Sequence, residues 1–80
     1  MTPENLRAIA AAARAKDSLP KGGYVLIFDG EAFGWKDALN RAETVRPGVF
    51  AVSEDGTIFE AFGGDEKIGA EAFRKADAQP

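Results

Sequence analysis

The sequence predicts an α+β fold: a four-stranded, mainly antiparallel sheet of two hairpins, flanked by an N-terminal and a C-terminal helix. Three observations lead to this prediction. An alanine-rich amphipathic segment opens the chain, two β-prone runs each contain an Asp-Gly pair, and a second helix-like segment follows Gly63-Gly64. With 80 residues, the chain is expected to form one domain over 1–80, because a second core would bury too little apolar surface to offset its ordering entropy.

The N-terminal segment is expected to be a helix over residues 3–17. Thr2 is a good N-cap, Pro3 is tolerated at the first helical position, and Glu4 lies favourably in the positive first turn. The apolar stripe has helical spacing and consists of Leu6, Ile9, Ala10 and Ala13. Because this stripe is mostly alanine, the helix should approach a sheet closely but anchor weakly.

The first hairpin is predicted over residues 23–36. Residues 24–28 are β-prone and apolar at successive positions, as expected for an interior strand. Asp29-Gly30 is a strong turn signal that returns the chain through residues 31–35, where Phe33 and Trp35 are expected to share one face. Residues 36–46 are polar and ambiguous, with at most a short helical turn near residues 37–39.

The second hairpin is predicted over residues 49–62, with two alternative registers. A two-residue turn at Asp55-Gly56 would place Phe50, Val52 and Phe59 on one face. A longer loop with a bulge would instead group Phe50, Val52, Ile58 and Phe62. Both registers leave apolar residues on the two faces of the sheet.

The C-terminal segment is predicted to be a helix over residues 65–76. Gly63-Gly64 ends the preceding strand, and Asp65 is a suitable N-cap. The apolar positions of this helix would be Ile68, Ala72 and Phe73.

The residue types present argue against catalysis. The sequence has no histidine and no cysteine, so it lacks the usual general base near neutral pH, an activated thiol, and imidazole or thiolate metal ligands. The acidic pairs Glu54-Asp55 and Asp65-Glu66 follow no calcium-loop pattern and are better explained as a turn and a helix start. We therefore expect no enzyme activity, no metal and no cofactor.

Charge and hydropathy narrow the partner classes. The formal net charge is -3, which argues against direct binding to phosphate backbones and would suit a basic partner surface. The chain has neither an uninterrupted apolar leader nor an apolar run of membrane-spanning length. A cytoplasmic protein with no membrane partner is expected.

Aromatic residues supply the positive evidence for binding. Most of them fall in the predicted sheet, and two short helices cannot easily cover both of its faces. An exposed apolar patch would mark a protein interface or a homodimer seam. Trp35 could be a core or an interface residue, and Arg46 could fix a turn or contact a partner. The candidate partner-binding residues are Trp35, Phe33, Lys36, Arg46, Glu54, Asp55, Glu60 and Asp65.

Residues 22–73 also carry a series of short motifs in a characteristic order: Phe33-Gly34-Trp35-Lys36, Arg46-Pro47-Gly48, Ala51-Val52 with Asp55-Gly56, Gly63-Gly64-Asp65, and Gly69-Ala70. In these motifs the chain resembles small accessory proteins of bacteriophages and integrative elements that are described as antirestriction proteins. The resemblance implies a counter-defence protein, active in the host cytoplasm, that blunts restriction or CRISPR defence. It implies no catalytic residue.

Three functional hypotheses follow. The first is a non-catalytic inhibitor, of anti-CRISPR or antirestriction type, that binds a host defence protein or complex. The second is a DNA mimic whose carboxylates at Glu54, Asp55, Glu60, Asp65 and Glu66 imitate phosphates. The third is a regulator that binds DNA through Arg7, Arg14 and Lys16 of the first helix, although these cations are sparse.

Overall fold

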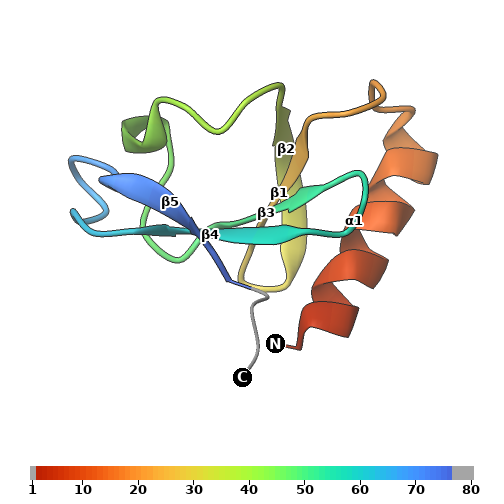
Figure 1. Cartoon of the computed structure of the whole chain (residues 1–80), viewed down its shortest axis with the longest axis horizontal. Coiled ribbons are helices and arrows are strands. Elements are labelled where there is room, and N and C mark those ends of the chain that lie inside the picture. Colours follow the sequence, from red (N-terminus) through yellow and green to blue (C-terminus); the bar gives the residue numbers. More distant parts are fainter. Residues whose placement is uncertain (1, 77–80) are drawn as a thin grey trace.

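The computed structural model describes residues 2–76; residues 1 and 77–80 of the predicted domain lie outside this range. The described chain forms one α-helix and a five-stranded sheet in which every neighbouring pair is antiparallel (Figure 1). The strand order is β2-β1-β3-β4-β5. The elements are α1 (Pro3–Asp17), β1 (Tyr24–Phe28), β2 (Glu31–Lys36), the 3-10 helix η1 (Ala42–Thr44), β3 (Phe50–Ser53), β4 (Ile58–Phe62) and β5 (Ala72–Lys75). The α+β class is confirmed, but the predicted four strands with two flanking helices are wrong.

Local signals set both ends of α1. The Thr2 hydroxyl oxygen accepts a hydrogen bond from the Asn5 backbone N–H at 3.1 Å, as an N-cap does. Ser18 ends the helix in the left-handed conformation, with φ 52°. Leu6, Ala10 and Ala13 are buried against the sheet, so the predicted stripe is the packed face.

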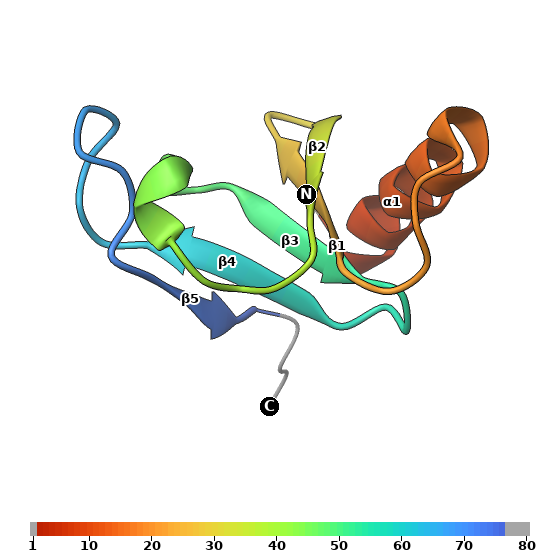
Figure 2. The same cartoon turned by 90° about the horizontal axis from the view of Figure 1, so that it is seen from above.

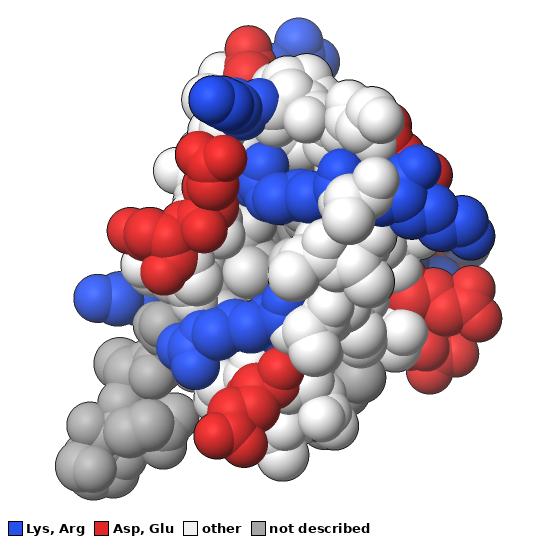
Figure 3. Space-filling model, turned by 90° about the vertical axis from the view of Figure 1, so that its right-hand side faces the viewer, with Lys and Arg blue, Asp and Glu red and all other residues white. Residues whose placement is uncertain are grey.

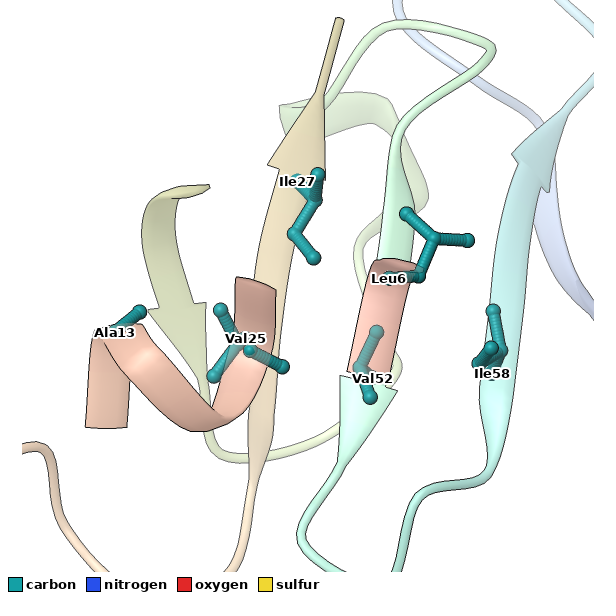
Figure 4. Packing of buried hydrophobic residues seen from close by; sticks show 7 residues of the cluster. Leu6, Ala13, Val25, Ile27, Val52 and Ile58 are labelled. Atoms are coloured by element: carbon teal, nitrogen blue, oxygen red, sulfur yellow. The ribbon is translucent and has the colours of Figure 1, made fainter. Parts of the chain in front are cut away.

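One core lies between α1 and the sheet. α1 packs across β1, β2, β3 and β4. Figure 4 shows Leu6 and Ala13 of the helix over Val25, Val52 and Ile58 of the strands. This core extends from β2 to β4, whereas β5 at the edge of the sheet lies farthest from the helix (Figures 1 and 2).

The second hairpin adopts the longer-loop register. Val52 lies opposite Ile58, and the Ser53 N–H donates to the Thr57 carbonyl at 2.8 Å. Three residues therefore form the loop, and Gly56 at its end has φ +92°, typical of a turn closed by a glycine bulge. Val52 and Ile58 consequently face α1 together.

The opposite face of the sheet carries a second core. Residues 37–49 cross this face and bring η1 to the end of the sheet away from α1 (Figure 2). The helical turn expected near residues 37–39 is thus found at Ala42–Thr44. The buried members of this core are Leu26, Ala42, Val45, Val49, Ala51, Ala61 and Ala70.

The predicted C-terminal helix is wrong. Asp65 does accept hydrogen bonds from the N–H groups of Lys67 and Ile68, both at 2.9 Å, as a capping residue would. The chain then closes a tight loop instead of a helix, because Asp65 and Gly69 form an antiparallel bridge: the Gly69 N–H donates to the Asp65 carbonyl at 2.8 Å, and the Asp65 N–H donates to the Gly69 carbonyl at 3.3 Å. Gly69 has φ +87°, and its neighbour Ala70 donates to the Val45 carbonyl at 2.8 Å.

The residues beyond this loop form β5. Phe73 lies opposite Ala61 of β4 and packs into the second core. Ile68, which the predicted helix would have buried, is 69% exposed. Pairing with β4 therefore prevails over the helical spacing of these residues.

Within residues 2–76, no helix is both long enough and apolar enough to cross a lipid bilayer.

Candidate protein-binding surface

The outer edge of the sheet at β2 exposes an aromatic side chain. Asp29 and Gly30 both have positive φ, at 54° and 82°, which suits a two-residue hairpin turn. Leu26 pairs with Gly34 but Ile27 pairs with Ala32, so Phe33 is an extra residue that forms a bulge in β2. The bulge leaves Phe33 56% exposed, the only large hydrophobic residue besides Ile68 that is exposed in the described chain.

A groove runs from Phe33 to Arg46 on the face of the sheet opposite α1. Its volume is about 360 Å³, and it is lined by Phe28, Glu31, Phe33, Thr44, Val45, Arg46 and Val49. We call it the Phe33–Arg46 groove. Its floor is apolar, because Val45 and Val49 belong to the second core, whereas Glu31, Thr44 and Arg46 make its rim polar.

Arg46 connects three parts of the molecule. Its guanidinium carbon lies 4.5 Å from the centroid of the Phe28 ring, a cation–π contact worth roughly 0.5–1 kcal/mol at exposed sites. Its Nη2 donates to Glu66 Oε2 at 3.1 Å. The Arg46 side chain is nevertheless 47% exposed. Arg46 therefore both fixes the loop and faces solvent at the groove.

A second hollow lies on the α1 side of β2. It has a volume of about 320 Å³ and is lined by Ala13, Asp17, Leu19, Ala32, Phe33, Gly34 and Trp35. Trp35 packs against the α1 core, and its Nε1–H donates to the Gly22 carbonyl at 3.2 Å. Trp35 therefore acts chiefly as a packing residue. Phe33 borders both hollows, one on each face of β2.

Lys36 lies at the far end of β2 from the hairpin turn. Its Nζ donates to the Thr44 hydroxyl oxygen at 3.4 Å, which links β2 to η1. Of the eight candidate residues, the structure thus brings Phe33 and Arg46 together in one groove, with Lys36 and Trp35 farther along the same strand.

The candidate acids at the β3–β4 turn stabilise that turn. Asp55 Oδ1 accepts hydrogen bonds from the Ser53 hydroxyl and from the Thr57 N–H. The Ser53 hydrogen bond, followed by that from Thr57, lowers the pKa of Asp55 to about 2. Glu54 Oε1 accepts from the Gly22 N–H at 3.0 Å. Both acids border a third hollow of about 410 Å³.

The remaining candidate acids lie elsewhere. Glu60 pairs with Arg74 at 3.3 Å, whereas Asp65 holds its own loop. The acids are thus spread along β4, with Glu54 and Asp55 at one end, Glu60 paired within the strand and Asp65 at the other end. On the side of the molecule that carries α1, basic and acidic side chains alternate (Figure 3). Neither the DNA-mimic nor the DNA-binding hypothesis gains support from this distribution.

Sequence reasoning found Phe33 and Arg46 but missed the rest of the groove. Val45 lies in a segment whose polar pattern predicted no packing, and the one local signal for the bulge at Phe33 is Gly34 within the strand. Within residues 2–76, no cluster of three or more acidic residues is placed to hold a metal ion.

Comparisons with known proteins identify no relative: no family model, curated protein or solved structure matches this chain.

Proposed function

We propose that this protein is a counter-defence inhibitor that binds a host restriction or CRISPR protein through the Phe33–Arg46 groove. One observation carries the binding part of the proposal: an exposed phenylalanine stands beside an apolar groove whose opposite rim is an arginine. Phenylalanine and arginine are both enriched at protein interfaces, and arginine is among the residues that most often dominate binding energy there. The counter-defence part rests on the antirestriction resemblance of residues 22–73.

The groove suits an apolar side chain of the partner. Covering the exposed part of Phe33 would contribute roughly 1–2 kcal/mol, given the usual value for burying a large apolar side chain. Arg46 is held by Phe28 and Glu66, so it loses little side-chain entropy on binding.

The net charge of -3 favours a partner with a basic surface around that apolar side chain. Proteins that handle nucleic acids have such surfaces, and restriction and CRISPR effectors belong to this class. Binding rather than catalysis is proposed because the sequence has no histidine or cysteine, and the acids of the β3–β4 turn are held by hydrogen bonds within the fold.

A co-purification experiment tests the proposal. Tagged wild-type protein, Phe33→Ser and Ile68→Ser are expressed in a restriction-proficient host, and retained proteins are identified by mass spectrometry. Ile68→Ser is the matched control, because Ile68 is the other large exposed hydrophobic residue and lines none of the hollows described above. Wild type and Ile68→Ser should retain the same defence protein, and Phe33→Ser should retain at least about ten-fold less. Equal retention by all three would contradict the proposal.

A further inference from the structure

The sheet has two free edges with different chemistry. β2 and β5 each pair with one neighbour only, so each presents unpaired backbone groups to its other side. β5 (Ala72–Lys75) carries Arg74 and Lys75 and no acid, so a second β5 beside it would gather like charges. β2 (Glu31–Lys36) has an acid at one end and a base at the other.

The β2 strand is self-complementary: two copies can pair antiparallel with compatible residues opposite each other. If two copies pair about the middle of this strand, Glu31 of each lies opposite Lys36 of the other. Ala32 then lies opposite Trp35, so a small side chain meets a large one. Phe33 lies opposite Gly34, so no second large side chain competes with the Phe33 ring where it borders the groove.

In this register, the side chains that would pair point to the same face of the sheet. Glu31 pairs with Phe28 and Lys36 pairs with Tyr24 of β1, and Phe28 and Tyr24 both pack on the core opposite α1. Residues that lie opposite each other in a sheet point to the same face. The two charged side chains would therefore meet on one side of the joined sheet.

We propose that two copies of this chain associate through their β2 edges, antiparallel and in this register, to form one continuous sheet. The charge complementarity of Glu31 and Lys36 specifies a second copy as the occupant of this edge. The bulge at Phe33 interrupts the regular ladder of backbone hydrogen bonds, so the side-chain pairs set the register. The hollow on the α1 side of β2 leaves room for side chains of the added strand, so the Phe33–Arg46 groove on the other face stays open.

This dimer has a consequence for the binding surface. The two-fold axis of an antiparallel pair within one sheet is perpendicular to the sheet. Both Phe33–Arg46 grooves would therefore open on the same side of the dimer. A dimeric target could engage both of them at once.

Sedimentation equilibrium of the purified protein tests the proposal without any host partner. Wild type should show a concentration-dependent dimer. Glu31→Lys and Lys36→Glu should each weaken it about ten-fold or more, because two attractive cross-strand pairs become repulsive. An equimolar mixture of the two variants should recover the dimer, since each strand then presents the charge that the other lacks.

Two controls make the outcome decisive. Far-UV circular dichroism checks that each variant is folded, and Lys75→Glu on the β5 edge should leave the dimer unchanged. A wild type that stays monomeric at millimolar concentration would overturn the proposal, and so would a mixture no more dimeric than the single variants. If Lys75→Glu weakens the dimer and the two β2 variants do not, the contact between the copies lies at β5 instead.

Discussion

Replacing Gly69 by alanine distinguishes the observed C-terminal loop and strand from the helix that the sequence predicts. Gly69 has φ +87°, and a Cβ added there would lie 2.1 Å from the Glu43 carbonyl oxygen. The left-handed backbone costs an alanine about 1 kcal/mol. Relieving the clash requires the backbone near Glu43 to move, which threatens the hydrogen bond from Ala70 to Val45, worth about 1 kcal/mol more.

The expected loss is therefore about 2–3 kcal/mol, equivalent to roughly 10–20 °C in Tm for a domain of this size. In a helix interior the same substitution would stabilise the protein by roughly 0.5–1 kcal/mol. Urea and thermal denaturation, followed by circular dichroism at low protein concentration, measure the sign of the change. Gly22→Ala is the control, because Gly22 has φ +73° but no atom within 4 Å of the added Cβ, so it should cost only about 1 kcal/mol. A Gly69→Ala variant at least as stable as wild type would refute the assignment of β5.

Two further predictions concern the core and the β3–β4 turn. Leu6→Ala should lower the free energy of unfolding by about 2–5 kcal/mol in urea denaturation, because Leu6 is buried between α1 and the sheet, whereas Ile68→Ala should change it by no more than about 0.5 kcal/mol. Ser53→Ala should raise the pKa of Asp55 from about 2 toward its ordinary value of 3.8, as measured by NMR titration of the carboxyl carbon. Because the folded pKa lies below the unfolded one, this carboxylate stabilises the fold above pH about 4, and its contribution disappears as the pH falls to about 2. If the pKa of Asp55 is unchanged in Ser53→Ala, the Ser53 hydroxyl is not the main cause of the lowered pKa.

The parts of the fold that the sequence predicts well are those set by neighbouring residues. The Thr2 cap, Pro3 and a stripe of helical spacing act within a few residues, and α1 has the predicted bounds. The Asp29-Gly30 turn is equally local. The register of the second hairpin depends on whether Val52 meets Ile58 across the sheet, so sequence alone left two alternatives.

The C-terminal prediction failed because its decisive contacts are distant in sequence. Asp65 forms the same short-range hydrogen bonds in a turn as in a helix cap. What excludes the helix is the approach of Gly69 to Glu43 and the pairing of Phe73 with Ala61. These contacts join segments whose proximity only the complete sheet establishes.

The candidate site was predictable in its chemistry but not in its geometry. Residue type identified Trp35 and Arg46 as interface candidates, and the aromatic residues of the predicted sheet added Phe33. Their meeting across one groove requires the bulge in β2 and the path of residues 37–49 over the sheet. The candidate acids, in contrast, are spread along β4: Glu54 and Asp55 lie at one end, Glu60 lies within the strand, and Asp65 lies at the other end.

Phage plating measures directly whether this protein protects incoming DNA by binding a defence protein through Phe33, as we propose. A restriction-proficient host carrying wild-type protein, Phe33→Ser or Ile68→Ser is infected with unmodified phage, and each plating efficiency is divided by that in a restriction-deficient host. A parallel CRISPR-proficient host covers the other defence class. Wild type and Ile68→Ser should raise the ratio to the same extent in one of the two hosts, and Phe33→Ser should raise it clearly less. Equal protection by Phe33→Ser and wild type would contradict the role of the groove, and no protection by any of the three proteins in either host would contradict the counter-defence function.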